Sequence, residues 1–104
     1  MVFWQADDLK LAEFRPGIMS RAATGDNLIM VCMQIDPDKE DTGHVHAFDQ
    51  CGMVIEGRLE MFIGEERKVL GAHDCYFIPA TTRHGWKTFD QPVRLLDVCP
   101  KQPA

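Results

Sequence analysis

The sequence predicts an all-β protein whose strands are antiparallel. Three observations carry this expectation: the apolar and alternating runs are short, they recur at regular spacing, and turn-forming residues separate them. None of the runs has the apolar spacing that is typical of a surface helix. About nine such runs favour an antiparallel sandwich or barrel, and the pattern alone does not choose between the two.

The N-terminal part of the chain is expected to contain a hairpin. Residues 9–14 fit either a short strand or one helical turn, and residues 15–17 (Arg-Pro-Gly) form a turn. Ile18–Thr24 and Leu28–Ile35 are predicted strands, because the Gly-Asp-Asn segment between them, residues 25–27, is a strong hairpin signal.

The strand Leu28–Ile35 is apolar at both odd and even positions. One barrel interior can cover only one of its faces, so the other face is expected to meet a second sheet or another subunit. We therefore predict a homodimer. The charged residues 36–41 that follow are expected to form a solvated loop.

The C-terminal part is expected to contain six more short strands. Gly57 and residues 64–66 supply turns, and Pro79 stops an apolar run. The predicted strands are residues 51–56, 58–63, 67–70, 75–78, 84–89 and 93–99.

Length and charge narrow the classes of partner. A chain of 104 residues can build one core, so we expect a single domain over residues 1–104. Its net charge of −5 disfavours nucleic acid or an anionic membrane, and an anionic substrate would need locally placed cations. Residues 1–8 do not resemble a signal peptide, and no apolar run is long enough to cross a membrane. A cytoplasmic protein is expected.

The four cysteines stand singly in apolar runs. Because no Cys-x-x-Cys pair is present, a zinc knuckle or a thioredoxin-like site is not expected. We predict buried free thiols in a reducing compartment. The cysteines are Cys32, Cys51, Cys75 and Cys99.

A histidine-rich stretch supplies candidate metal ligands. His44 and His46 are two residues apart, so on a strand both imidazoles would face the same way, and Gln50 keeps that parity. Asp49 has the opposite parity and is not favoured as a ligand. His84 follows in a second segment, and imidazoles suit Zn, Cu, Fe or Ni.

These four residues, with Gly57 and Pro79, fall at the spacing of two paired motifs. Over roughly residues 37–98 the sequence resembles the cupin superfamily, with Gln50 in the place of a motif glutamate. The resemblance implies a double-stranded β-helix, which is a small jelly-roll barrel. It also implies one divalent transition metal ion (Zn, Ni, Mn or Fe) held by His44, His46, Gln50 and His84.

One branch of that superfamily is matched more closely. Residues 44–97 are similar to the uronate cyclases of pectin and alginate breakdown, small cupins that convert unsaturated monouronates toward linear keto acids. The segment 96–98 (Leu-Asp-Val) carries this resemblance, which implies that Asp97 is the catalytic acid/base. Cys99 stands where that branch has an aromatic residue.

The strand pattern around Asp97 leaves two placements open, either at a strand edge facing water or inside the barrel with a partner. An inward Asp97 would suit a general base, since burial raises the pKa of a carboxyl and a metal lowers it. The candidate substrate-binding residues are Arg21, Tyr76 and Arg94, with Arg83 as a further anion holder.

Three function classes follow from these observations. The first is a metal-dependent enzyme that isomerises a small oxygenated, carboxylated compound by proton transfer. The second is a dioxygenase, because three histidines can also hold Fe(II) for O₂ activation. The third is a binding or sensor module that takes a small ligand without turnover.

Overall fold

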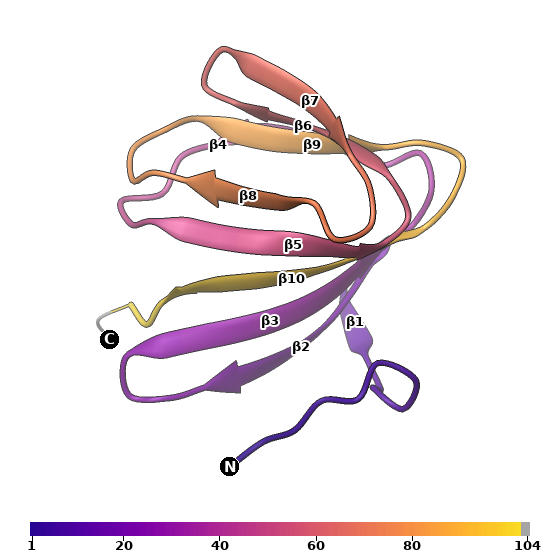
Figure 1. Cartoon of the computed structure of the whole chain (residues 1–104), viewed down its shortest axis with the longest axis vertical. Coiled ribbons are helices and arrows are strands. Elements are labelled where there is room, and N and C mark those ends of the chain that lie inside the picture. The colour runs from indigo at the N-terminus through magenta and orange to yellow at the C-terminus, as the bar shows by residue number, and fades with distance from the viewer. Residues whose placement is uncertain (103–104) are drawn as a thin grey trace.

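Ten antiparallel strands form two sheets in this computed structural model, which describes residues 1–102 (Figure 1). One sheet has six strands in the order β1-β2-β3-β10-β5-β8, and the other has four in the order β4-β9-β6-β7. The two sheets face each other as the halves of a jelly-roll barrel, so the all-β, antiparallel prediction is confirmed. The strands are β1 Ala12–Arg15, β2 Ile18–Thr24, β3 Leu28–Ile35, β4 Glu40–His44, β5 Gln50–Glu56, β6 Leu59–Ile63, β7 Glu66–Leu70, β8 Cys75–Ile78, β9 His84–Thr88 and β10 Val93–Pro100.

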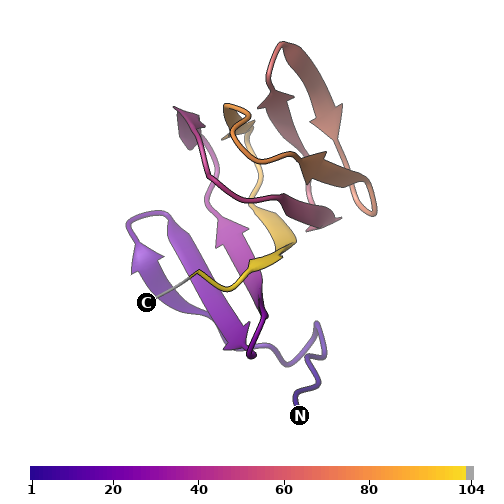
Figure 2. The ribbon, with the colours of Figure 1, turned by 90° about the vertical axis from the view of Figure 1, so that its left-hand side faces the viewer.

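The last strand, β10, lies in the interior of the six-stranded sheet. It pairs along its whole length with β3 and over residues 94–98 with β5. In Figure 2 the yellow β10 is seen beside strands from the first half of the chain. Asp97 is thereby placed opposite Gly52 on β5, and Gly52 in turn is opposite Tyr76 on β8.

The core lies between the two sheets. Along the regular strands alternate residues point inward, as the period of an extended chain requires. Burial of each large aliphatic side chain contributes about 1.5–3 kcal/mol to stability. The buried core residues are Ile18, Ile35, Val54, Leu59, Met61, Tyr76, Ile78, Val93 and Leu95.

The chain's own N-terminal segment lies beside the outer face of β3. Trp4 and Leu9 line a pocket against Met30 and Cys32 on that face. This contact accounts for part of the two-sided apolar pattern of Leu28–Ile35, and the homodimer stays a prediction. Residues 9–14, which fitted a strand or a helical turn, contain the strand β1.

Two sequence-based expectations about loops and burial are wrong. Residues 36–41 are not all loop, because Glu40 and Asp41 begin β4. Cys51 and Cys75 are exposed rather than buried. They alternate with the inward residues of β5 and β8, so their thiols point away from the core. Among the described residues, no helix is long and apolar enough to cross a membrane.

Candidate metal centre

Three histidines converge at one end of the barrel. One ligand nitrogen from each of His44, His46 and His84 can be chosen so that all lie within 4.8 Å of one another. The ring centroids of His44 and His84 are 4.2 Å apart, since the two residues are directly opposite each other on β4 and β9. The predicted convergence of the three imidazoles is therefore present in the fold.

The route by which His46 and Gln50 join this cluster differs from the sequence argument. Residues 44–50 are not one strand: β4 ends at His44, and β5, in the other sheet, begins at Gln50. His46 lies on the connection between the sheets. Two hydrogen bonds tie this connection to the β8–β9 turn: Thr81 N donates to His46 O at 2.7 Å, and Ala80 N donates to the Asp49 carboxylate at 2.8 Å.

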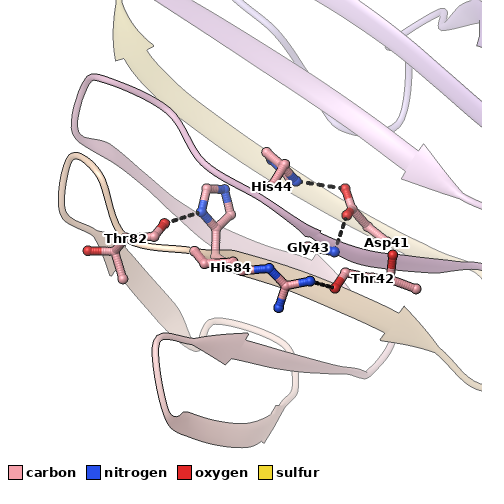
Figure 3. A network of polar contacts seen from close by, with 7 residues as sticks. Asp41, Thr42, Gly43, His44, Thr82 and His84 are labelled. Atoms are coloured by element: carbon pink, nitrogen blue, oxygen red, sulfur yellow. Dashed lines mark hydrogen bonds and ion pairs between the residues drawn. The ribbon is translucent and has the colours of Figure 1, made fainter.

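His84 is buried, with 3% of its surface exposed, and its two ring nitrogens have different surroundings. Nδ1 is 3.0 Å from the carbonyl oxygen of Thr82 (Figure 3). A carbonyl oxygen can only accept a hydrogen bond, so Nδ1 carries a proton, and in the neutral ring Nε2 has a free lone pair. Nε2 is buried and has no hydrogen-bond partner within the described chain.

His44 is oriented in a similar way by a carboxylate. Its Nδ1 lies 2.9 Å from Asp41 Oδ2, and the other oxygen of Asp41 accepts a hydrogen bond from Gly43 N at 2.9 Å (Figure 3). A carboxylate that accepts from Nδ1 leaves Nε2 of the same ring free to bind a metal. Asp41 was missed by the sequence analysis, which placed it in a solvated loop.

A strand irregularity explains how Asp41 reaches His44. Residues three apart on a regular strand face opposite sides, but the β4–β9 register shifts between these two residues. Gly43, at φ 133°, lies inside this shift and is covered by the Arg83 guanidinium. Arg83 donates to Thr42 O at 2.6 Å and lies 5.4 Å from the centre of the Phe62 ring. It therefore holds β4 in place.

His46 is the least constrained imidazole of the three. Its ring stacks on Phe48 with the centroids 4.7 Å apart. Burial lowers the pKa of His46. The neighbouring His44 and His84 lower this pKa further, whereas the Asp41 carboxylate raises it. The lowered pKa favours the neutral imidazole, which is the form that binds metal.

The imidazoles open into a cavity of about 270 Å³ between the two sheets. This volume suits a small molecule. Its polar wall on the six-stranded side consists of Gln50, Tyr76 and Asp97, and β1 contributes Phe14 and Arg15 at one edge. Asp97 thus faces the barrel interior, which decides between the two placements that the sequence left open.

Asp97 and Tyr76 contact each other across a glycine. The Tyr76 hydroxyl donates a short hydrogen bond to Asp97 Oδ1. A Cβ atom at Gly52, which lies between them, would be 2.5 Å from both that hydroxyl and Asp97 Oδ1. Burial raises the pKa of Asp97, while the Tyr76 hydroxyl, the Gln50 amide and the charge of His84 lower it. Burial and Asp97 also raise the pKa of Tyr76, which stays protonated as a donor.

Two of the expected substrate-binding residues lie elsewhere. Arg94 alternates with the inward residues of β10 and points to the outer face, where it donates to Gln34 at 3.0 Å. Arg21 is outward on β2 opposite Cys32 and lines a separate surface pocket. Strand alternation therefore keeps both guanidinium groups away from the cavity, and only Tyr76 of that set lines it.

A family comparison agrees with this architecture. Residues 31–99 match the family model described as Cupin domain. The chain belongs to the cupin family. The predicted cupin fold is thereby confirmed. The three histidines, Gln50 and Asp97 lie inside the matched region, whereas the lining residues Phe14 and Arg15 precede it.

Solved structures with the same cupin fold cover nearly the whole chain. KdgF from Halomonas sp. has a TM-score of 0.86 at 25% identity, over 99% of this chain and 96% of that chain. The polyketide cyclase RemF from Streptomyces resistomycificus has a TM-score of 0.82 at 22% identity, over 100% and 82%. The cupin domain of Cnp3 from Schizosaccharomyces pombe has a TM-score of 0.83 at 10% identity, over 97% and 74%. The last two show the shared fold alone. No curated protein matches the sequence.

The residues present fit a divalent transition metal ion. The His84 Nε2 lone pair is buried and unpartnered, and a buried polar atom without a partner is costly. The hydrogen bonds of His84 and His44 leave one free nitrogen on each ring, on rings that face each other. Gln50 lines the same cavity and offers an amide oxygen as a fourth donor.

Proposed function

We propose that this cupin is a metal-dependent enzyme that isomerises a small oxygenated sugar acid by proton transfer, in the manner of the uronate cyclases. The observation that carries the proposal is the position of Asp97, a carboxylate that lines the same small cavity as three converging imidazoles. Burial raises the pKa of Asp97, which is the direction that suits a general acid/base.

His44, His46, His84 and Gln50 would hold the ion. All four are neutral donors, so a bound divalent ion keeps its full charge and supplies Lewis acidity toward a carbonyl or hydroxyl oxygen of the substrate. Asp41 and the Thr82 carbonyl keep two of the imidazoles in the ligating tautomer. This donor set differs from the two-histidine, one-carboxylate site of non-haem Fe(II) oxygenases.

Asp97 would accept the proton from the carbon next to the substrate carbonyl and return it to a neighbouring atom. The Tyr76 hydroxyl is a donor to Asp97 Oδ1 and fixes the direction of the carboxylate. The other oxygen, Oδ2, would take the substrate proton. Apolar side chains, among them Met61, Ile78 and Leu95, line the rest of the cavity and limit the access of water.

The proposal is tested by metal analysis followed by a substrate screen. Purified protein should contain one metal ion per chain, and the Zn- or Ni-loaded protein should convert unsaturated monouronates under argon. Oxygen uptake that requires ferrous iron would instead favour a dioxygenase. Tight uronate binding without turnover would favour a binding module. Either result would reject the isomerase proposal.

A further inference from the structure

The cavity wall carries a single cationic side chain. Of the eleven lysines and arginines in the sequence, all within the described residues, Arg15 alone lines the cavity that contains the histidines. Its charged companions there, apart from the imidazoles, are Asp41 and Asp97. Since the net charge of the chain is −5, Arg15 is the one side chain of the cavity wall that favours an anion, in addition to the proposed metal ion.

A bulge in the first strand directs Arg15 to this place. The β1–β2 register shifts between Glu13 and Arg15, so the consecutive residues Phe14 and Arg15 both line the cavity. On a regular strand, neighbouring side chains would face opposite sides, and bulges commonly re-aim a side chain beside a functional site. The turn that follows is tight, with Gly17 at φ 84° against the Lys39 side chain.

The Arg15 guanidinium is held but not neutralised. It lies 5.8 Å from the centre of the Phe14 ring, which favours a position over that ring. Among the described residues it has no ion-pair partner within 4.0 Å. Asp41, an acidic residue that lines the same cavity, is already bonded to His44 and to the Gly43 amide. The donors of Arg15 are therefore free for a ligand.

We infer that Arg15 selects a substrate with a carboxylate, which it binds at the cavity mouth while the oxygens at the opposite end of the substrate reach the three histidines. A guanidinium matches a carboxylate with two parallel hydrogen bonds. A dianionic phosphate would fit less well, because Asp41 and Asp97 share the wall. The inference deepens the proposed function and rests on it for the direction in which the substrate lies.

The test is a binding measurement with unreactive probes. Calorimetry on the metal-loaded protein would compare glucuronate, its uncharged methyl ester and glucose 6-phosphate. We expect the wild type to bind glucuronate about tenfold more tightly than the ester, the usual worth of a hydrogen bond to a charged group. Arg15→Gln should reduce this ratio to about one, whereas Arg21→Gln, on the outer face, should keep it. Arg15→Lys should give an intermediate ratio, because the charge remains without the paired donors.

Three results would overturn the inference: no preference for glucuronate over its ester in the wild type, an unchanged preference in Arg15→Gln, or tighter binding of glucose 6-phosphate. Arg15 is exposed, and equal melting temperatures would exclude unfolding as the cause of a loss. The measurement needs no turnover. A preference that depends on Arg15 in a protein that converts no uronate would therefore reject the proposed reaction and keep the carboxylate specificity.

Discussion

The two walls of the cavity differ in what their side chains can do. On the four-stranded side, His44 and His84 face each other on β4 and β9, and each has Nδ1 bound to an oxygen acceptor. On the six-stranded side, Tyr76 and Asp97 come from β8 and β10, and the Tyr76 hydroxyl donates a hydrogen bond to Asp97 Oδ1. The first wall, which we call the histidine wall, offers ring nitrogens that can bind a metal. The second, which we call the carboxylate wall, offers a hydroxyl and a carboxylate that can donate or accept a proton.

This difference teaches that metal binding and proton transfer are separable in the proposed enzyme. His46 lies on the connection between the two walls, and Gln50 lies at the end of that connection, where β5 begins. These two residues therefore link the proposed metal site to the wall that contains Asp97. A substitution on the histidine wall should change metal content, whereas one on the carboxylate wall should change turnover. The following predictions test that separation.

The largest effect is expected for His46→Ala combined with His84→Ala. Two of the three converging imidazoles are removed, so the metal content should fall from one per chain to none, and turnover should fall with it. Elemental analysis measures the metal, and circular dichroism checks that the barrel remains folded. His73→Asn is the matched control, because His73 is exposed, has φ 73° and lies outside the cluster. Stoichiometric metal in the double variant would remove the ligand assignment.

A smaller effect, restricted to turnover, is expected for Asp97→Asn. The amide is similar in shape and can still accept the Tyr76 hydrogen bond, but it cannot act as a base. We expect about a 10²-fold or greater loss of rate, the usual contribution of a positioned general base. Metal content, melting temperature and turnover should be measured on one preparation, with the exposed Asp90→Asn as control. Full activity in Asp97→Asn would reject Asp97 as the base.

The smallest effect is expected for Asp41→Asn, a substitution beside His44 on the histidine wall. The amide accepts a weaker hydrogen bond from His44 Nδ1 and holds the ring less firmly. Metal affinity should fall about tenfold, at the lower end of the range for residues that orient a ligating histidine. Competition with a chelator measures this change, and Asp38→Asn on the preceding turn is the control. An unchanged affinity would mean that the strand alone orients His44.

Much of the fold was predictable because its signals are local. Short apolar runs with turn residues between them located the strands, and the motif spacing of His44, His46 and His84 indicated the cluster. Asp41 was not predictable, because it reaches His44 through a bulge whose register depends on pairing with β9. Arg15 was missed for the same reason, since an irregularity in pairing directs it inward.

The outward arginines show a different limit of sequence analysis. Arg94 lies between Val93 and Leu95, which point inward together with Asp97. Alternation along the strand therefore places Arg94 on the outer face once the orientation of Asp97 is known. The sequence did not decide whether the Asp97 side chain faces solvent or the barrel interior. The face of Arg94 could therefore not be assigned either. Burial of Leu95 against Val54 decides both residues together.

The interior position of β10 has a consequence for how the protein is made. Only 14 residues separate the end of β3 at Ile35 from the start of β5 at Gln50. Each of these strands nevertheless pairs with β10, so neither pairing can form before residues 93–100 are present. A ribosome that has released only β1 to β9 therefore carries a chain with two unpaired strand edges, which are templates for aggregation. Asp97 lies on that same strand, so no partly synthesised chain has the carboxylate in place. The proposed acid/base therefore enters the cavity wall in the same step that joins β3 to β5 through β10.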